Sequence, residues 1–156
     1  RLVLEGVRLG GGALLGGGDP AVDRECVDRG RIGWAALATG TAQAVLDYAI
    51  PYVNERTAFG EPISNRQAVA FAVSDIGIET DGLRLATYRA ASRADRGSDF
   101  AREAAIARRL ATDHGMRIGS DGVQLLGGHG YIKEHPVERW YRDLRAAGVL
   151  EGGLLV

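Results

Sequence analysis

The fold of this chain is decided by residues 119–153, GSDGVQLLGGHGYIKEHPVERWYRDLRAAGVLEGG. The stretch begins as the end of a helical pattern, breaks at Gly127 and Gly128, and resumes after a proline as a charged amphipathic segment. It then reaches a lone carboxylate, Glu151, between apolar residues and glycines. Together with Gly130, the glycine pair would let the backbone turn sharply and lie close to a ligand. A helix C-cap explains two of the three glycines equally well.

Upstream of this stretch the sequence has the periodicity of long helices. Apolar residues recur at three- and four-residue steps over about 23–55, 65–96 and 98–126, and a shorter helix is expected over about 136–147. Pro51 should kink the first helix because its ring removes one backbone donor. Brief loops join the segments, so the pattern predicts an all-α fold, an antiparallel up-down four-helix bundle.

The second helix has a candidate start and a candidate core face. Ser64 or Asn65 is its expected N-cap. Eight apolar residues mark the face expected to pack into the core, namely Val69, Phe71, Val73, Ile76, Ile78, Leu83, Leu85 and Tyr88.

The first twenty residues have a different character. Leu2, Leu4 and Val7 alternate with polar or charged residues, and glycine runs follow at 10–12 and 16–18. This pattern is typical of a strand or two followed by a flexible loop. We therefore expect residues 1–20 to be a short β and loop segment before the helical domain of 21–156.

Composition narrows the functional class. The 156 residues suffice for one good core, and a formal net charge of -1 with 25% charged residues leaves no basic face for nucleic acid or a membrane surface. No apolar run approaches the roughly 18 to 20 residues of a membrane span and no signal-peptide pattern is present, so the cytoplasm is the expected location. The one cysteine, Cys26, excludes an internal disulfide and is expected to be buried. The three histidines lack the spacing of a metal site.

Two blocks of sequence resemble the C-terminal helical domain of acyl-CoA dehydrogenases. One is the segment Arg56-Thr-Ala-Phe-Gly60 with Gln67 behind it; the other comprises Gln124, Gly127, Gly128, Gly130, Tyr131, Pro136, Glu138, Arg139, Tyr141, Arg142 and Asp143, with an acid eight residues further on. Their order and separation are those of the family. The resemblance implies that 21–156 form this bundle domain and that 1–20 are a remnant of the preceding β-domain and its linker.

The resemblance assigns catalysis to Glu151. In the family, the acid at this position removes the α-proton of an acyl-CoA thioester while the β-carbon gives a hydride to FAD. Such a base must lie close to the α-carbon and away from water, so that its pKa rises toward the working pH. The alternative is a solvated acid at the end of the chain. A family variant places the base just before Arg31, but Gly30 carries no carboxylate, which favours Glu151.

The resemblance also implies binding residues. Asp28, Arg31 and Gly152 would contact the substrate. An i, i+3 pair of Asp28 with Arg31 on an exposed helix turn explains Asp28 equally well, whereas the substrate contact is favoured for Arg31. Arg56 would reach the FAD pyrophosphate, because a guanidinium offers a planar donor fork to phosphate. The other implied FAD contacts are Ala58, Phe59, Gln67, Gln124, Leu125, Leu126, Gly127 and Gly128, of which Gln124–Gly128 would meet the adenine half held by a neighbouring subunit.

One departure from the family follows the expected base. The family usually has Thr after the Glu-Gly pair and Gln two positions later, where this chain has Gly153 and Leu155. Either the chain belongs to a divergent branch of the family, or its FAD contacts at this end are weakened.

The function implied by the resemblance is FAD-dependent α,β-dehydrogenation of an acyl-CoA, as part of a larger enzyme. Electrons would pass to an electron-transfer flavoprotein, and the protein would be a homodimer or homotetramer. Two alternatives remain open: a non-catalytic helical dimerisation module from a truncated gene, and a related acyl-CoA oxidase or flavin monooxygenase.

Overall fold

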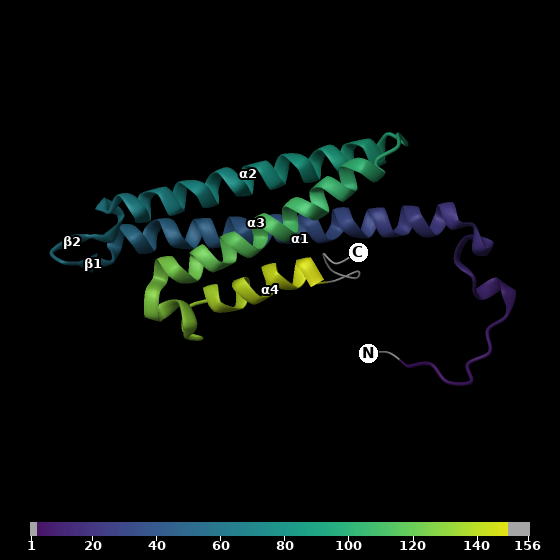
Figure 1. Cartoon of the computed structure of the whole chain (residues 1–156), viewed down its shortest axis with the longest axis horizontal. Coiled ribbons are helices and arrows are strands. Elements are labelled where there is room, and N and C mark those ends of the chain that lie inside the picture. The colour runs from purple at the N-terminus through teal and green to yellow at the C-terminus, as the bar shows by residue number, and fades with distance from the viewer. Residues whose placement is uncertain (1–2, 150–156) are drawn as a thin grey trace.

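The computed structural model describes residues 3–149, and four packed helices dominate this part of the chain (Figure 1). They are α1 (Pro20–Glu55), α2 (Gln67–Asp95), α3 (Ala101–Leu126) and α4 (Val137–Val149). Figure 1 shows α2 along one side of the molecule and α4 along the other, with α1 and α3 between them. The predicted all-helical bundle is thereby confirmed.

Local chemistry sets the helix ends. Asp19 caps α1, because its Oδ1 accepts a hydrogen bond from the Ala21 N–H at 2.8 Å and Pro20 occupies the first turn. The helix continues through Pro51, which is exposed, and ends at Glu55. At the other end of the bundle, Gly97 has φ +64° and ends α2.

The start of α2 differs from the sequence prediction. Ser64 and Asn65 belong to a short 3₁₀ turn, Ile63–Asn65, and the N-cap position is held by Arg66 without a side-chain capping bond. The chain spends one further residue in extended conformation after the turn, and this shifts the helix start.

Small side chains allow the helices to approach closely. Seven alanines between residues 3 and 149 are 0 to 1% exposed, and the larger core residues are aliphatic. A Cβ at Gly122 would lie 2.7 Å from Val45 Cγ1, so α3 needs glycine there to meet α1. The residues that fill this core include Ala35, Ala42, Ala49, Ala90, Ala107, Val45, Ile76, Leu83, Ile118 and Leu144.

Half of the predicted core face of α2 is wrong. Ile76 and Leu83 are buried and Val69 and Val73 are partly buried, as predicted. The remaining four residues, Phe71, Ile78, Leu85 and Tyr88, are 59 to 71% exposed. The helix carries apolar residues around most of its circumference, so periodicity alone could not tell the buried side from the outer side.

The expected strand near the N-terminus is also wrong within the described residues. Residues 3–19 contain two short 3₁₀ turns, Gly11–Ala13 and Leu15–Gly18, and run away from the bundle (Figure 1). A strand needs a partner for its backbone groups, and alternation without one does not form a sheet. Between residues 3 and 149 the two strands are β1 (Thr57–Ala58) and β2 (Glu61–Pro62), which form a hairpin between α1 and α2.

Two further findings concern composition. Cys26 is exposed, contrary to the expectation of burial. Across the part of the chain that the structure describes, none of the helices is long and apolar enough to cross a membrane.

Candidate cofactor site

A groove of about 560 Å³ lies where the end of α1, the hairpin and the start of α2 meet the end of α3. This volume is in the range of small-molecule and cofactor sites. Eight of the nine predicted cofactor residues line it, from two segments far apart in sequence; Gln67 is not among the lining residues. The eight are Arg56, Ala58, Phe59, Gln124, Leu125, Leu126, Gly127 and Gly128.

The hairpin presents an aromatic ring at the groove. Phe59 and Gly60 have φ of +57° and +87°, as the central residues of a tight two-residue turn require. Phe59 is 92% exposed, and the guanidinium carbon of Arg66 lies 5.0 Å from its ring centroid. A left-handed conformation in a bulky residue is costly, of order 1 to 3 kcal/mol, and such strain is often associated with ligand sites.

Two arginines supply positive charge to the groove. Arg66 forms a 3.6 Å ion pair with Glu61, whereas Arg56 forms none within residues 3–149. The backbone of Arg56 is held at both ends, since its N–H donates to the Tyr52 carbonyl and its own carbonyl accepts from the Ile63 N–H, both at 2.9 Å. Paired phosphates are a natural ligand for two guanidinium groups that line one groove.

The glycines of the opposite wall have distinct roles. Gly127 ends α3 with φ +58° and ψ -131°, a conformation that favours glycine. Gly130 packs so closely on α3 that a Cβ there would collide with the Val123 carbonyl and lie 2.9 Å from Val123 Cα. Gly128 has open space at its Cβ position and leaves the groove unobstructed. The buried side chains of Leu125 and Leu126 add apolar lining.

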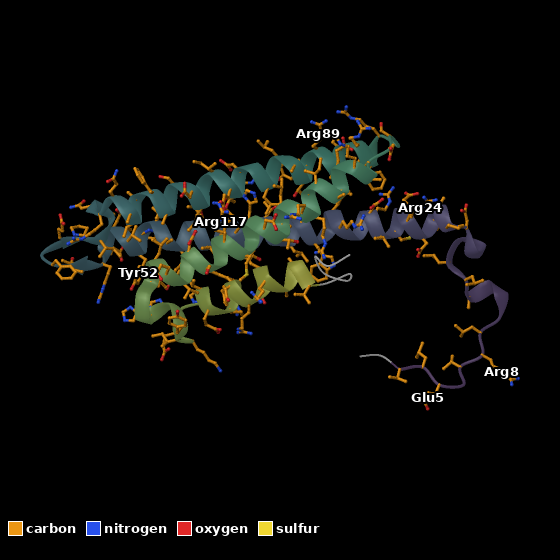
Figure 2. All side chains as sticks on the ribbon, in the orientation of Figure 1. Glu5, Arg8, Arg24, Tyr52, Arg89 and Arg117 are labelled. Atoms are coloured by element: carbon orange, nitrogen blue, oxygen red, sulfur yellow. The ribbon has the colours of Figure 1, made fainter. Side chains whose placement is uncertain are left out.

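A cluster of two tyrosines and two histidines holds this wall against α1. The Tyr52 hydroxyl lies 2.8 Å from His129 Nδ1 and donates to the Leu126 carbonyl at 3.3 Å. One helical turn earlier, the Tyr48 hydroxyl lies 2.7 Å from His135 Nδ1, and the two imidazoles stack with centroids 5.2 Å apart. Figure 2 places Tyr52 on α1 beside the glycine turn.

Asp28 and Arg31 lie elsewhere. The i, i+3 pair is present, since Asp28 accepts a 2.8 Å hydrogen bond from Arg31 Nη1, and it is partly buried, with 12% of the Asp28 side chain and 37% of the Arg31 side chain exposed. Asp28 lines a separate groove of about 420 Å³ between α1 and the α2–α3 loop. Both residues lie on α1, which ends at Glu55 just before Arg56, and 25 to 28 residues at about 1.5 Å each put them roughly 40 Å from Arg56. The predicted substrate and cofactor residues are therefore not gathered in one groove.

The predicted base, Glu151, and the neighbouring Gly152 lie outside the described residues. The described chain stops at Val149, at the end of α4. This end is packed against the middle of α3, where Arg108 donates to the Ala147 carbonyl and a Cβ at Gly148 would lie 2.7 Å from Thr112 Cγ2. The catalytic assignment of Glu151 therefore stays a prediction.

A third groove, of about 410 Å³, lies between α3 and α4. Asp121 and Glu138 line it, and the sequence analysis assigned no role to either carboxyl group. Burial raises the pKa of Asp121, and Asp75 raises it further, while Arg117 partly offsets both. The pKa of Glu138 is lowered, chiefly by hydrogen bonds from Arg142 at 3.0 and 3.1 Å. The two acids therefore titrate in opposite directions from their ordinary values.

Sequence reasoning missed three residues of the cofactor groove. Arg66 lies between the Phe-Gly pair and Gln67. Its position near Arg56, the predicted phosphate contact, was a signal in the sequence that could have identified it as a second cation of the site. Tyr52 precedes Arg56 by one helical turn and therefore shares its face. His129 lies inside the glycine turn, but its role depends on the contact with α1, which no local pattern reveals.

Known proteins similar to this chain agree on one family. The family described as acyl-CoA dehydrogenase, C-terminal domain, matches residues 20–154. The mitochondrial short-chain specific acyl-CoA dehydrogenase of Bos taurus is 40% identical over 155 residues, which is 97% of this chain and 37% of that protein. The CarC subunit of the caffeyl-CoA reductase-Etf complex of Acetobacterium woodii is 41% identical over 126 residues, 81% of this chain and 33% of that subunit.

A solved structure shows the same fold. Butyryl-CoA dehydrogenase from Megasphaera elsdenii superimposes with a TM-score of 0.84 at 37% identity, over 88% of this chain and 36% of that one. The chain thus spans little more than a third of the length of these relatives. Members of the family bind FAD. The family match, the identities and the shared helical architecture establish that this chain belongs to the acyl-CoA dehydrogenase family, as its C-terminal domain.

Proposed function

We propose that this chain is the C-terminal part of an FAD-dependent acyl-CoA dehydrogenase and that the groove beside the hairpin binds FAD. The observation that carries the proposal is the convergence of eight predicted cofactor residues on one groove. Their chemistry fits the cofactor, since guanidinium groups suit a pyrophosphate, the glycine turn permits close approach, and the leucines and Phe59 offer apolar contact.

In the proposed reaction, FAD would accept the hydride that leaves the β-carbon of the acyl-CoA. Glu151 would take the α-proton, so that the two hydrogens leave as a proton and a hydride and an α,β double bond forms. Asp28, Arg31 and Gly152 would contact the thioester substrate, and Gln67 would extend the FAD contacts along the start of α2. Relatives of this chain occur in complexes with electron-transfer flavoproteins, which supports such a flavoprotein as the electron acceptor.

The proposal includes self-association and a cellular location. We propose a homodimer or homotetramer, because in the family the segment from Gln124 to Gly128 meets FAD held by a neighbouring subunit. The location stays predicted as cytoplasmic, while the bovine relative carries a mitochondrial designation.

Titration of the chain with FAD, followed by flavin fluorescence or calorimetry, tests the groove. Arg56→Ala should weaken binding by about tenfold or more, because a charge-assisted contact to phosphate contributes about 1.5 to 3 kcal/mol. Arg109→Ala is the matched control, since Arg109 lies on α3 outside the groove and pairs with Asp113. Equal affinities for the two variants would contradict the assignment, and absence of FAD binding by the unaltered chain would favour the assembly module.

A further inference from the structure

The glycine turn after α3 carries an ionisable side chain at the cofactor groove. His129 lies in this turn and lines the groove together with Arg56 and Arg66, and no aspartate or glutamate between residues 3 and 149 lines it. Imidazole changes its charge between pH 5 and 8, whereas a guanidinium stays charged and a phenol stays neutral over that range. Within the described part of the chain, His129 is therefore the one lining residue whose charge can follow the pH near neutrality.

The ring of His129 is held by two neighbours. Its Nδ1 lies 2.8 Å from the Tyr52 hydroxyl, and the ring stacks on that of His135 with centroids 5.2 Å apart and an angle of 19° between the planes. The Tyr52 ring meets it edge-on, with centroids 6.2 Å apart. Nε2 of His129, in contrast, has no hydrogen-bond partner within residues 3–149. A held ring with one uncommitted nitrogen, in a residue that lines a groove, is a pre-organised hydrogen-bonding group.

Protonation of this ring preserves its contact with Tyr52. In an imidazolium both nitrogens donate, so Nδ1–H bonds to the Tyr52 oxygen and Nε2–H is left for a ligand. The other charged or titratable groups around it are Arg56 after α1, Arg66 before α2 and His135 before α4, while α3 contributes only uncharged residues to the groove. These groups are cationic or become so on protonation, and an anion in the groove would offset the repulsion between them.

The second imidazole limits the pair to a single positive charge. Two stacked rings with centroids 5.2 Å apart repel each other when both are protonated, so the pair accepts one proton more readily than two. His129 lines the groove and His135 does not. A bound anion therefore favours the state in which His129 carries the proton.

We propose that His129 is a further cofactor-binding residue, which as an imidazolium donates from Nε2 to the pyrophosphate of FAD, and that Tyr52 is its positioning residue. This inference rests on the proposed function, because it needs a pyrophosphate in the groove. Arg56 and Arg66 supply charge that does not depend on pH near neutrality, and His129 supplies charge that does. Since binding favours the protonated ring, the affinity for a pyrophosphate rises as the pH falls from 8 to 6.

The test is calorimetric titration of the full chain with FAD and with ADP-ribose at pH 6 and pH 8. ADP-ribose carries the pyrophosphate without the flavin, and it has no phosphate monoester that would itself titrate near neutral pH. Both ligands should bind about fivefold to tenfold more tightly at pH 6, because a charge-assisted hydrogen bond is roughly twice as strong as a neutral one. Repeating the titration near pH 7 in buffers of different ionisation enthalpy should show proton uptake on binding.

The two histidines provide a matched pair of variants. His129→Asn removes the ionisable group but keeps a hydrogen-bonding atom near the Nδ1 position, so it should bind ADP-ribose with the same affinity at pH 6 and pH 8. His135→Asn is the control, because His135 makes the same kind of contact, 2.7 Å from its Nδ1 to the Tyr48 hydroxyl, outside the groove lining. It should retain the gain at pH 6. His129→Gln repeats the measurement with a second neutral side chain, and circular dichroism checks that each variant is folded.

The two tyrosines test the positioning role in the same way. Tyr52→Phe keeps the ring but offers no acceptor to Nδ1–H of the imidazolium, so the gain in affinity at pH 6 should fall to about twofold or less. Tyr48→Phe should retain the gain. If Tyr52→Phe retains it too, Tyr52 does not position His129.

The outcomes separate this inference from the proposed function. If the unaltered chain binds FAD and ADP-ribose equally well at pH 6 and pH 8, the inference is wrong and the FAD assignment stands. The same holds if the gain at pH 6 survives in both His129 variants, or if His135→Asn loses it as His129→Asn does. A chain that binds neither ligand at either pH would overturn the proposed function and this inference with it.

Discussion

Individual residues show how the same chemical group acquires different properties in different surroundings. Asp121 and Glu138 line one groove, yet burial and Asp75 raise the pKa of the first while Arg142 lowers the pKa of the second. The carboxyl group of Asp121 holds its proton more tightly in the folded state than in the unfolded state. Its stabilising contribution is therefore present below the unfolded pKa of 3.8 and lost as the pH rises through the raised value. For Glu138 the contribution is present above 4.5 and lost as the pH falls through the lowered value.

This difference predicts opposite pH effects for two conservative substitutions. Asp121→Asn should increase the free energy of unfolding at neutral pH, and the gain should shrink as the pH approaches 3.8 from above, because the unaltered carboxyl becomes neutral too. Glu138→Gln should decrease it at neutral pH, with the loss shrinking in acid. Urea denaturation at several pH values measures both. A change in the free energy of unfolding that has the same sign in both variants at neutral pH would contradict the assigned pKa shifts.

At the scale of elements, the turn after α3 is determined by contacts on both of its sides. Gly127 supplies the positive φ that ends the helix, and Gly130 lets the turn fold back on Val123. The Tyr52–His129 and Tyr48–His135 hydrogen bonds then hold the turn and the start of α4 against α1. The groove wall is thus positioned by α1 and α3 together rather than by the turn alone.

The turn predicts a difference between two neighbouring glycines. Gly130→Ala should lower the free energy of unfolding by about 1 to 3 kcal/mol, because its Cβ would overlap the backbone of Val123 and force the chain to shift. Gly128→Ala, with open space at its Cβ position, should change the stability much less. Chemical denaturation of the two proteins checks this, and equal losses would mean that the close packing at Gly130 is not what holds the turn.

At the scale of the whole molecule, the bundle brings distant segments together and leaves others apart. Antiparallel packing of α1, α2 and α3 places residues 56–59 beside residues 124–128, so that one groove forms from both family blocks. The same packing keeps Asp28 and Arg31 at the far half of α1. The described residues predicted to bind substrate and those predicted to bind the cofactor therefore lie at opposite ends of α1.

The proposed base is tested in a polypeptide that also carries the segments preceding this chain in its longer relatives. Glu151→Gln should leave flavin absorbance unchanged and lower acyl-CoA dehydrogenation by at least about 10² to 10⁴-fold, the usual contribution of a positioned base. Steady-state turnover with an artificial electron acceptor measures the effect. If the variant turns over as fast as the unaltered enzyme, Glu151 is not the base, and the FAD assignment is unaffected.

The sequence by itself determined the local structure and the candidate residues. Helical periodicity and the glycine breaks predicted the four helices, because these signals act within a few residues of the chain. The two blocks that resemble the acyl-CoA dehydrogenases supplied the eight residues that were later found in one groove. The boundaries at 20 and 21 and the role of Glu151 stay predictions.

Only the tertiary structure decided which side of each helix is buried and which residues meet. Phe71, Ile78, Leu85 and Tyr88 have the hydrophobicity of core residues, but α1 and α3 occupy the other side of α2 and leave these four exposed. Residues 3–19 alternate like a strand but have no partner strand. His129 and Tyr52 are 77 positions apart and meet only because the bundle folds back on itself. Burial and pairing depend on neighbours distant in sequence, and for that reason local pattern could not supply them.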